Sequence, residues 1–215
     1  NRKGLLMLNR LPVLVIALLL AACAGPESVR PVPEQPAAQA ARPGDLPAVA
    51  LTPDVLYYLL LGEIAGHRGR LDVSVPSLAN VARKTRDPRI AERAALAALY
   101  ARDAKLALET SKLWVELRPN HIEAHEAHAS ALLESGQPQA ARDEYLATLA
   151  RVEPARRGVT LLRFAGTLSR YGNRQQAHEV MKALAERYDN LPEAWIAAAH
   201  LAVRALLFLP RAYFG

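Results

Sequence analysis

The sequence predicts an all-α fold built as a solenoid of antiparallel helix pairs. Hydrophobic residues make up 51% of the 215 residues, and alanine and leucine dominate while only 11 glycines occur. Small residues recur about every 34 residues at one place in the first helix of each pair and at one place in the second helix. Glycine and proline separate the helical stretches. Because one helix pair cannot cover its own apolar face, several pairs must stack to form a core.

Residues 1–22 have the pattern of a signal peptide. Arg2, Lys3 and Arg10 precede an apolar run that ends in small residues, and the segment has no acidic residue. The apolar run is too short for a membrane anchor, which needs about 20 residues. Its end, Leu20-Ala-Ala-Cys23, resembles a bacterial lipobox. We therefore expect Cys23 to carry covalent lipid, such as palmitate, and to become the new N-terminus.

The same cysteine indicates where the chain works. Cys23 is the sole cysteine, so the chain has neither a disulfide framework nor a cysteine nucleophile. In bacterial lipoproteins an aspartate after the lipidated cysteine retains the protein in the inner membrane, and Ala24 follows here. The expected location is the outer membrane, facing the periplasm, with no cofactor other than the lipid.

Residues 23–50 are expected to form a tether. Six prolines and few charges leave residues 24–50 unable to bury enough apolar surface to offset the entropy of ordering.

Residues 51–204 are predicted to form the repeat array, with about four repeats and the start of a fifth. Small residues at spacings of 33, 34, 36 and 34 mark the first helix of each unit: Gly62, Ala95, Ala129, Ala165 and Ala199. This period is typical of tetratricopeptide (TPR) repeats. Thr52-Pro53 and Asp87-Pro88 pair a capping residue with proline, and Asn120 with Glu123 has the pattern of a capping box.

Residues 205–215 abandon the repeat pattern. They supply no second helix for the fifth unit and no polar capping helix. The chain therefore has the sequence expected of the front part of a longer array, cut short. The alternative is that this apolar end docks on a partner.

The first helices of a TPR array line a concave groove that receives a peptide or a helix. The repeat phase directs one pair of residues from each unit into this groove: Leu59, Glu63, Glu92, Leu96, Glu126, Ser130, Leu162 and Gly166. Each could equally be an ordinary exposed helix position.

Three histidines are the sharpest candidates for chemistry. His121, His125 and His128 are spaced i, i+4, i+7 and share one helix face, an arrangement that can bind zinc or nickel. The opposing interpretation, which we favour, is one buried imidazole at His128 and two solvated ones, with no metal.

No pattern in the sequence predicts an enzyme. It has no Ser/His/Asp spacing, no glycine-rich phosphate loop and thus no expected small-molecule substrate. The net charge of +6 comes from scattered arginines and lysines, so it does not predict nucleic-acid binding.

The lipobox, the tether and three stretches of the array resemble a group of proteobacterial TPR outer-membrane lipoproteins. The stretches are residues 51–66, 82–94 and 113–119. The resemblance implies an adaptor that assembles with a periplasmic carboxyl-terminal processing protease, a serine protease, activates it and presents cell-wall hydrolases to it. A pilotin-like role in pilus or secretin assembly is the alternative.

Overall fold

A computed structural model describes residues 49–170 and 173–206 of the chain. The predicted signal peptide, Cys23, most of the tether and residues 207–215 lie outside the described residues. Every regular element in the described part is helical. The helices are α2 (Pro53–His67), α3 (Leu71–Thr85), α4 (Pro88–Ala101), α5 (Ala104–Leu117), α6 (Ile122–Glu134), α7 (Pro138–Arg151), the 3₁₀ turn η2 (Pro154–Arg156), α8 (Arg157–Leu168), α9 (Arg174–Arg187) and α10 (Pro192–Leu206). None of these helices is both long and apolar enough to cross a membrane.

Local capping explains where several helices begin. The Thr52 hydroxyl accepts a hydrogen bond from the Val55 N–H, and the Asp87 carboxylate accepts one from the Arg89 N–H. Proline follows each cap at the first helical position, as predicted. The predicted capping box at Asn120 is wrong, because His121 is the N-cap of α6 and no side chain caps that helix.

Turns and interruptions follow the backbone rules of their residues. Gly69 and Gly136 end α2 and α6 with positive φ angles of 71° and 77°, a conformation that glycine adopts without a steric penalty. Pro76 lies inside α3, which continues through it to Thr85. A proline at this position suggests either a kink or a late helix start, and the start of α3 at Leu71 excludes the late start.

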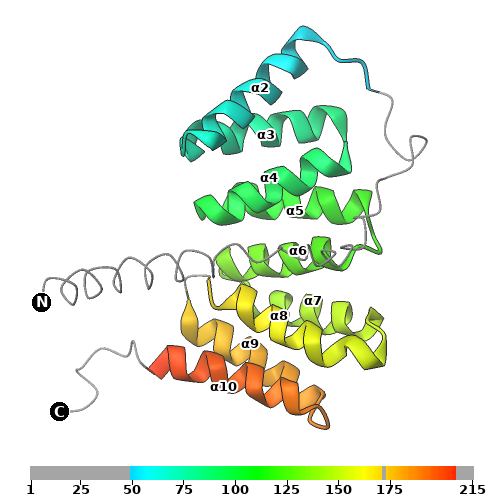
Figure 1. The fold of residues 1–215 in the computed structure, drawn as a ribbon, viewed down its shortest axis with the longest axis vertical. Helices are drawn as coiled ribbons and strands as arrows, with labels where there is room; N and C mark the ends of the chain where they lie inside the picture. Colours follow the sequence, from blue (N-terminus) through cyan, green and yellow to red (C-terminus); the bar gives the residue numbers. More distant parts are fainter. Residues whose placement is uncertain (1–48, 171–172, 207–215) are drawn as a thin grey trace, which may run out of the picture. The chain divides into compact units, whose positions relative to one another are not determined.

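Adjacent helices pair and stack from α2 to α7, so the predicted solenoid of helix pairs is confirmed (Figure 1). Two hydrophobic clusters fill it. One joins α3, α4 and α5 to one side of α6, and the other joins the opposite side of α6 to the helices that follow. Helix α6 is thus buried on two sides, and it is the element shared by both clusters.

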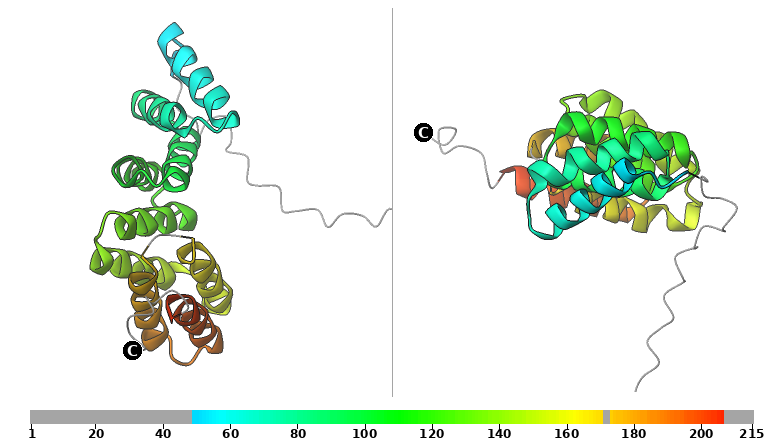
Figure 2. Two further views of the ribbon diagram at one scale, coloured as in Figure 1. Left: turned by 90° about the vertical axis from the view of Figure 1, so that its left-hand side faces the viewer. Right: turned by 90° about the horizontal axis from the view of Figure 1, so that it is seen from above.

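The fourth unit departs from regular pairing. Helix α8 packs mainly on α10, while α9 packs on α7 and α10, so α8 and α9 barely touch (Figures 1 and 2). The aromatic contact between Tyr145 and Phe164, 4.8 Å between ring centres, still ties α8 to α7. The small-residue pattern also shifts here: Ala199 is exposed, and the neighbouring Ala198 is buried in its place.

Small residues allow close approach where the pattern predicts it. A Cβ added to Gly62 would lie 2.9 Å from Leu78 Cγ and 3.4 Å from the Leu78 backbone nitrogen. At this point the Ser74 hydroxyl donates a hydrogen bond of 2.7 Å to the Gly62 carbonyl. Helices α2 and α3 therefore lie closer together here than a side chain at residue 62 would allow.

The variant Gly62→Val is expected to lower the free energy of unfolding by about 1–3 kcal/mol, since overpacking displaces Leu78 and separates α2 from α3. Gly166→Val is the matched control, because no atom lies within 4 Å of a Cβ built there. It is expected to change the stability by less than about 1 kcal/mol. Urea denaturation of the full chain measures both, and equal losses would contradict the close-packing interpretation.

Candidate functional site

A groove between α2, α3 and α4 is the candidate binding surface. Its volume is about 430 Å³. Its lining is mostly apolar and comes from all three helices: Gly62, Glu63, Gly66, His67, Leu71, Ser74, Leu78, Arg93, Leu96, Ala97 and Tyr100. Leu96 and Tyr100 are 49% and 79% exposed, so apolar surface faces solvent at one wall. Glu63 and Leu96, two of the residues predicted for the protein-binding groove, are among its lining residues, and their role in binding stays a prediction.

Glu63 gives the groove its polar character. One of its carboxylate oxygens pairs with the Arg93 guanidinium across the groove. The other oxygen, Oε1, is buried and accepts no hydrogen bond within the described part of the chain. A buried acceptor without a donor is costly, so a ligand that supplies an N–H at this point would be stabilised.

The other residues predicted for the groove differ in how far they are buried and in whether they line this groove. Leu59 is half-buried against the first hydrophobic cluster, and Glu92 is half-buried on α4. Leu162 and Gly166 are exposed on α8 but do not line this groove. They therefore remain predictions.

Glu126 and Ser130 are buried on α6, so in this arrangement neither faces an open groove. The Ser130 hydroxyl bonds to the Tyr145 hydroxyl at 2.8 Å and donates to the Glu126 carbonyl at 2.9 Å. The Glu126 carboxylate accepts from Thr167 at 2.6 Å and pairs with Arg163 at 3.0 Å. Two side chains of α8 therefore cover the position that the repeat phase assigned to the groove.

The pKa values of two groups on α6 shift, those of the buried Glu126 and the half-buried His128. Burial raises the pKa of Glu126, and the hydrogen bond from Thr167 and the charge of Arg163 oppose that rise. Burial lowers the pKa of His128, whose Nδ1 lies 3.2 Å from the Ser111 hydroxyl.

The histidines do not form a metal site in this arrangement. His125, not His128, is the buried imidazole, and His128 is half-buried. The prediction of the buried position was therefore wrong by one helical turn. His125 Nδ1 lies 2.5 Å from Glu144, and His125 Nε2 lies 2.8 Å from the Pro119 carbonyl. His121 instead packs on the Trp114 ring at 5.4 Å. Among the described residues, no three His, Cys, Asp or Glu side chains are grouped to hold a metal ion.

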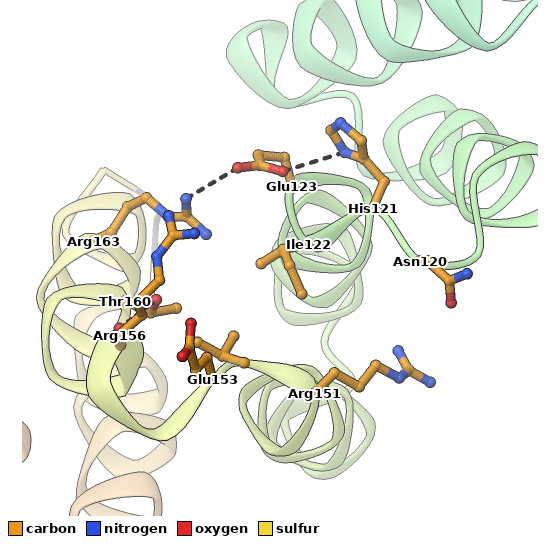
Figure 3. A pocket seen from close by; sticks show the side chains of 10 residues that line it. Asn120, His121, Ile122, Glu123, Arg151, Glu153, Arg156, Thr160 and Arg163 are labelled. Atoms are coloured by element: carbon orange, nitrogen blue, oxygen red, sulfur yellow. Dashed lines mark hydrogen bonds and ion pairs between the residues drawn. The ribbon is translucent and has the colours of Figure 1, made fainter. Parts of the chain in front are cut away.

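A second, polar cavity of about 340 Å³ lies where α6 begins, α7 ends and α8 begins (Figure 3). Arg151, Arg156 and Arg163 contribute to its wall together with Glu123 and Glu153. No sequence pattern predicts this cavity, because its residues come from three separate helix ends.

Comparisons with known proteins agree with the repeat pattern. No protein-family model matches the chain. A TPR repeat-containing protein of Pseudomonas aeruginosa is 34% identical over 136 residues, which cover 61% of this chain and 23% of that protein. The fold is a TPR solenoid. The chain spans about a quarter of the length of this curated relative.

Solved structures give a weaker likeness. The crystal structure of a MamA protein is 16% identical, with 71% of this chain and 86% of that chain covered and a TM-score of 0.44. MamA of Desulfovibrio magneticus is 19% identical, with coverage of 71% and 94% and a TM-score of 0.42. At TM-scores below 0.5, these likenesses carry no information about function.

The variant His128→Leu is expected to reduce the loss of stability between about pH 7 and pH 5. In the unfolded chain His128 titrates near its ordinary value of about 6.5, whereas burial lowers its pKa in the folded chain. His128 therefore contributes stability above about pH 6.5, its ordinary pKa, and this contribution is lost as the pH falls through its pKa in the folded chain. Urea denaturation across this range, with the exposed His67→Leu as control, measures the effect. An unchanged pH slope in His128→Leu would contradict it.

Proposed function

We propose that this chain is a membrane-anchored TPR scaffold that binds protein partners through the groove between α2, α3 and α4. The observation that carries the proposal is the combination of exposed Leu96 and Tyr100 with the unpartnered oxygen of Glu63. An apolar wall next to a buried hydrogen-bond acceptor suits a peptide segment, which presents an apolar side chain and a backbone N–H together. TPR repeats occur in a relative of 34% identity, and such helical arrays bind other proteins.

The proposed partner is a periplasmic carboxyl-terminal processing protease. The support for it is the resemblance of the lipobox, the tether and the three array segments to adaptor lipoproteins. In this role the chain would assemble with the protease, activate it and present cell-wall hydrolases, without catalysing a reaction itself. The lipid on Cys23 would hold the scaffold at the outer membrane, on its periplasmic side.

The anchor can be tested apart from the partner. Cys23→Ser removes the thiol that the lipid requires, so the full chain is expected to lose labelled palmitate and to leave the outer-membrane fraction. Ser28→Ala, a polar change five residues further along the tether, is the control and should keep both. Equal palmitate labelling of the two variants would overturn the lipoprotein assignment.

The groove can be tested by photo-crosslinking. A benzoyl-phenylalanine at position 100 of the full chain, in periplasm-facing membranes, is expected to capture the protease. Leu96→Asp should lower that yield about tenfold, because burying a leucine side chain contributes about 1.5–3 kcal/mol. Leu60→Asp is the matched control, since Leu60 is a similarly exposed leucine that does not line the groove and is not among the predicted groove residues.

Each crosslinking outcome has a distinct meaning. Capture of a secretin in place of the protease would favour the pilotin-like role. Equal yields from Leu96→Asp and Leu60→Asp would contradict the assignment of the groove.

A further inference from the structure

The polar cavity at the third repeat arises from two additional residues in the chain. The spacing from Ala129 to Ala165 is 36 residues, against 33 or 34 in the two preceding intervals. The surplus falls in the connection after α7, where η2 (Pro154–Arg156) forms an extra turn. Helix α8 then begins away from α7 and packs mainly on α10. The polar cavity lies between the three helix ends beside this connection.

The three arginines of the cavity differ in how far they are engaged. Arg163 is neutralised by Glu123, at 3.1 Å, and by Glu126, at 3.0 Å. The Arg156 side chain is exposed and, within the described part of the chain, makes no hydrogen bond or ion pair. Arg156 therefore offers a full guanidinium at the cavity wall.

Arg151 and the Pro119 carbonyl both contact the same nitrogen of His125. The Arg151 Nη1 lies 2.9 Å from His125 Nε2, which also lies 2.8 Å from the Pro119 carbonyl. The arginine needs a lone pair on Nε2, whereas the carbonyl needs a proton there, so Nε2 can satisfy only one of them. Arg151 thus lines the cavity while its Nη1 is turned toward His125.

The backbone adds further donors. Asn120, His121, Ile122 and Glu123, at the start of α6, line the cavity, and no side chain caps this helix. The first N–H groups of a helix lack intrahelical partners, and the helix dipole favours negative charge near them. The arginines and this uncapped helix start thus surround one space.

We propose that this cavity, the Arg156 pocket, binds a carboxylate of a peptide. A carboxylate accepts paired hydrogen bonds from a guanidinium and carries one negative charge. Glu153 in the wall disfavours a doubly charged phosphate, and its carboxylate can accept a hydrogen bond from a peptide N–H. The volume of about 340 Å³ lies at the small end of the range for ligand pockets. The Arg156 pocket is separate from the α2–α4 groove, so its ligand does not depend on the proposed function of that groove.

Titration calorimetry of the full chain at low salt tests the proposal with four probes. N-acetyl-glutamic acid amide presents a side-chain carboxylate, and N-acetylglycine presents a terminal one. N-acetyl-glutamine amide is the uncharged counterpart, and inorganic phosphate is the competing oxyanion. At least one carboxylate probe is expected to bind at least about tenfold more tightly than the uncharged probe and phosphate, and the tighter of the two identifies the type of carboxylate.

Substitution at the pocket supplies the second readout. Arg156→Gln is expected to weaken carboxylate binding about tenfold, because it removes a charged hydrogen bond. Arg142→Gln changes a partly exposed arginine of α7 that pairs with Asp143; it is the matched control and should bind as the unaltered chain does. The Arg156 side chain is exposed and the Arg142 side chain is 43% exposed, so neither variant should unfold the chain.

Three results would overturn the proposal. They are equal binding of the charged and uncharged probes, tighter binding of phosphate than of either carboxylate, and equal affinities of Arg156→Gln and Arg142→Gln. None of these results would affect crosslinking at the α2–α4 groove.

Discussion

The burial of α6 on two sides is the constraint on which the rest of the described structure depends. A helix inside an array has no solvent to satisfy its polar side chains, so each one must find a partner on a neighbouring helix. Ser130 uses Tyr145 of α7, and Glu126 uses Arg163 and Thr167 of α8. The polar residues of α6 therefore connect it to both helices that follow.

The carboxylate of Glu126 also limits the binding surface. Desolvation raises its pKa, and contacts from α8 offset part of that cost. These contacts place α8 over the part of α6 that would otherwise be open to a ligand. Arg102, at the end of α4, donates a hydrogen bond of 2.9 Å to the Arg170 carbonyl at the end of α8, two units further along the chain. Within the described residues the open apolar groove therefore lies at α2–α4, and the polar cavity lies at the helix ends beyond it.

Much of the fold follows from local sequence. Thr52 and Asp87 cap helices because their side chains reach the first N–H groups, and Gly69 and Gly136 turn because glycine adopts positive φ. Two of the residues that line the candidate groove were equally predictable, since Glu63 and Leu96 follow the repeat phase. The capping box at Asn120 failed because a matching pattern does not ensure that the helix begins at that residue. The sequence also could not predict that His125 is buried and not His128, because both lie on one face of the helix. Only the tertiary contacts of His125 with Glu144 and the Pro119 carbonyl distinguish the two.

The sequence alone was enough to predict a helical repeat with a period near 34 residues. The reason is that small residues and turn residues affect only the structure of the residues near them in the chain, so their spacing reports the repeat directly. The sequence also carried the lipobox pattern at Cys23. The tertiary structure alone decided that α8 packs on α10, that Glu126 is covered and that three arginines meet around one cavity. Those outcomes depend on contacts between segments that are distant in the chain, such as α8 with α10 and Glu126 with Thr167. No local pattern reports those contacts, since every helix involved keeps an ordinary helical sequence.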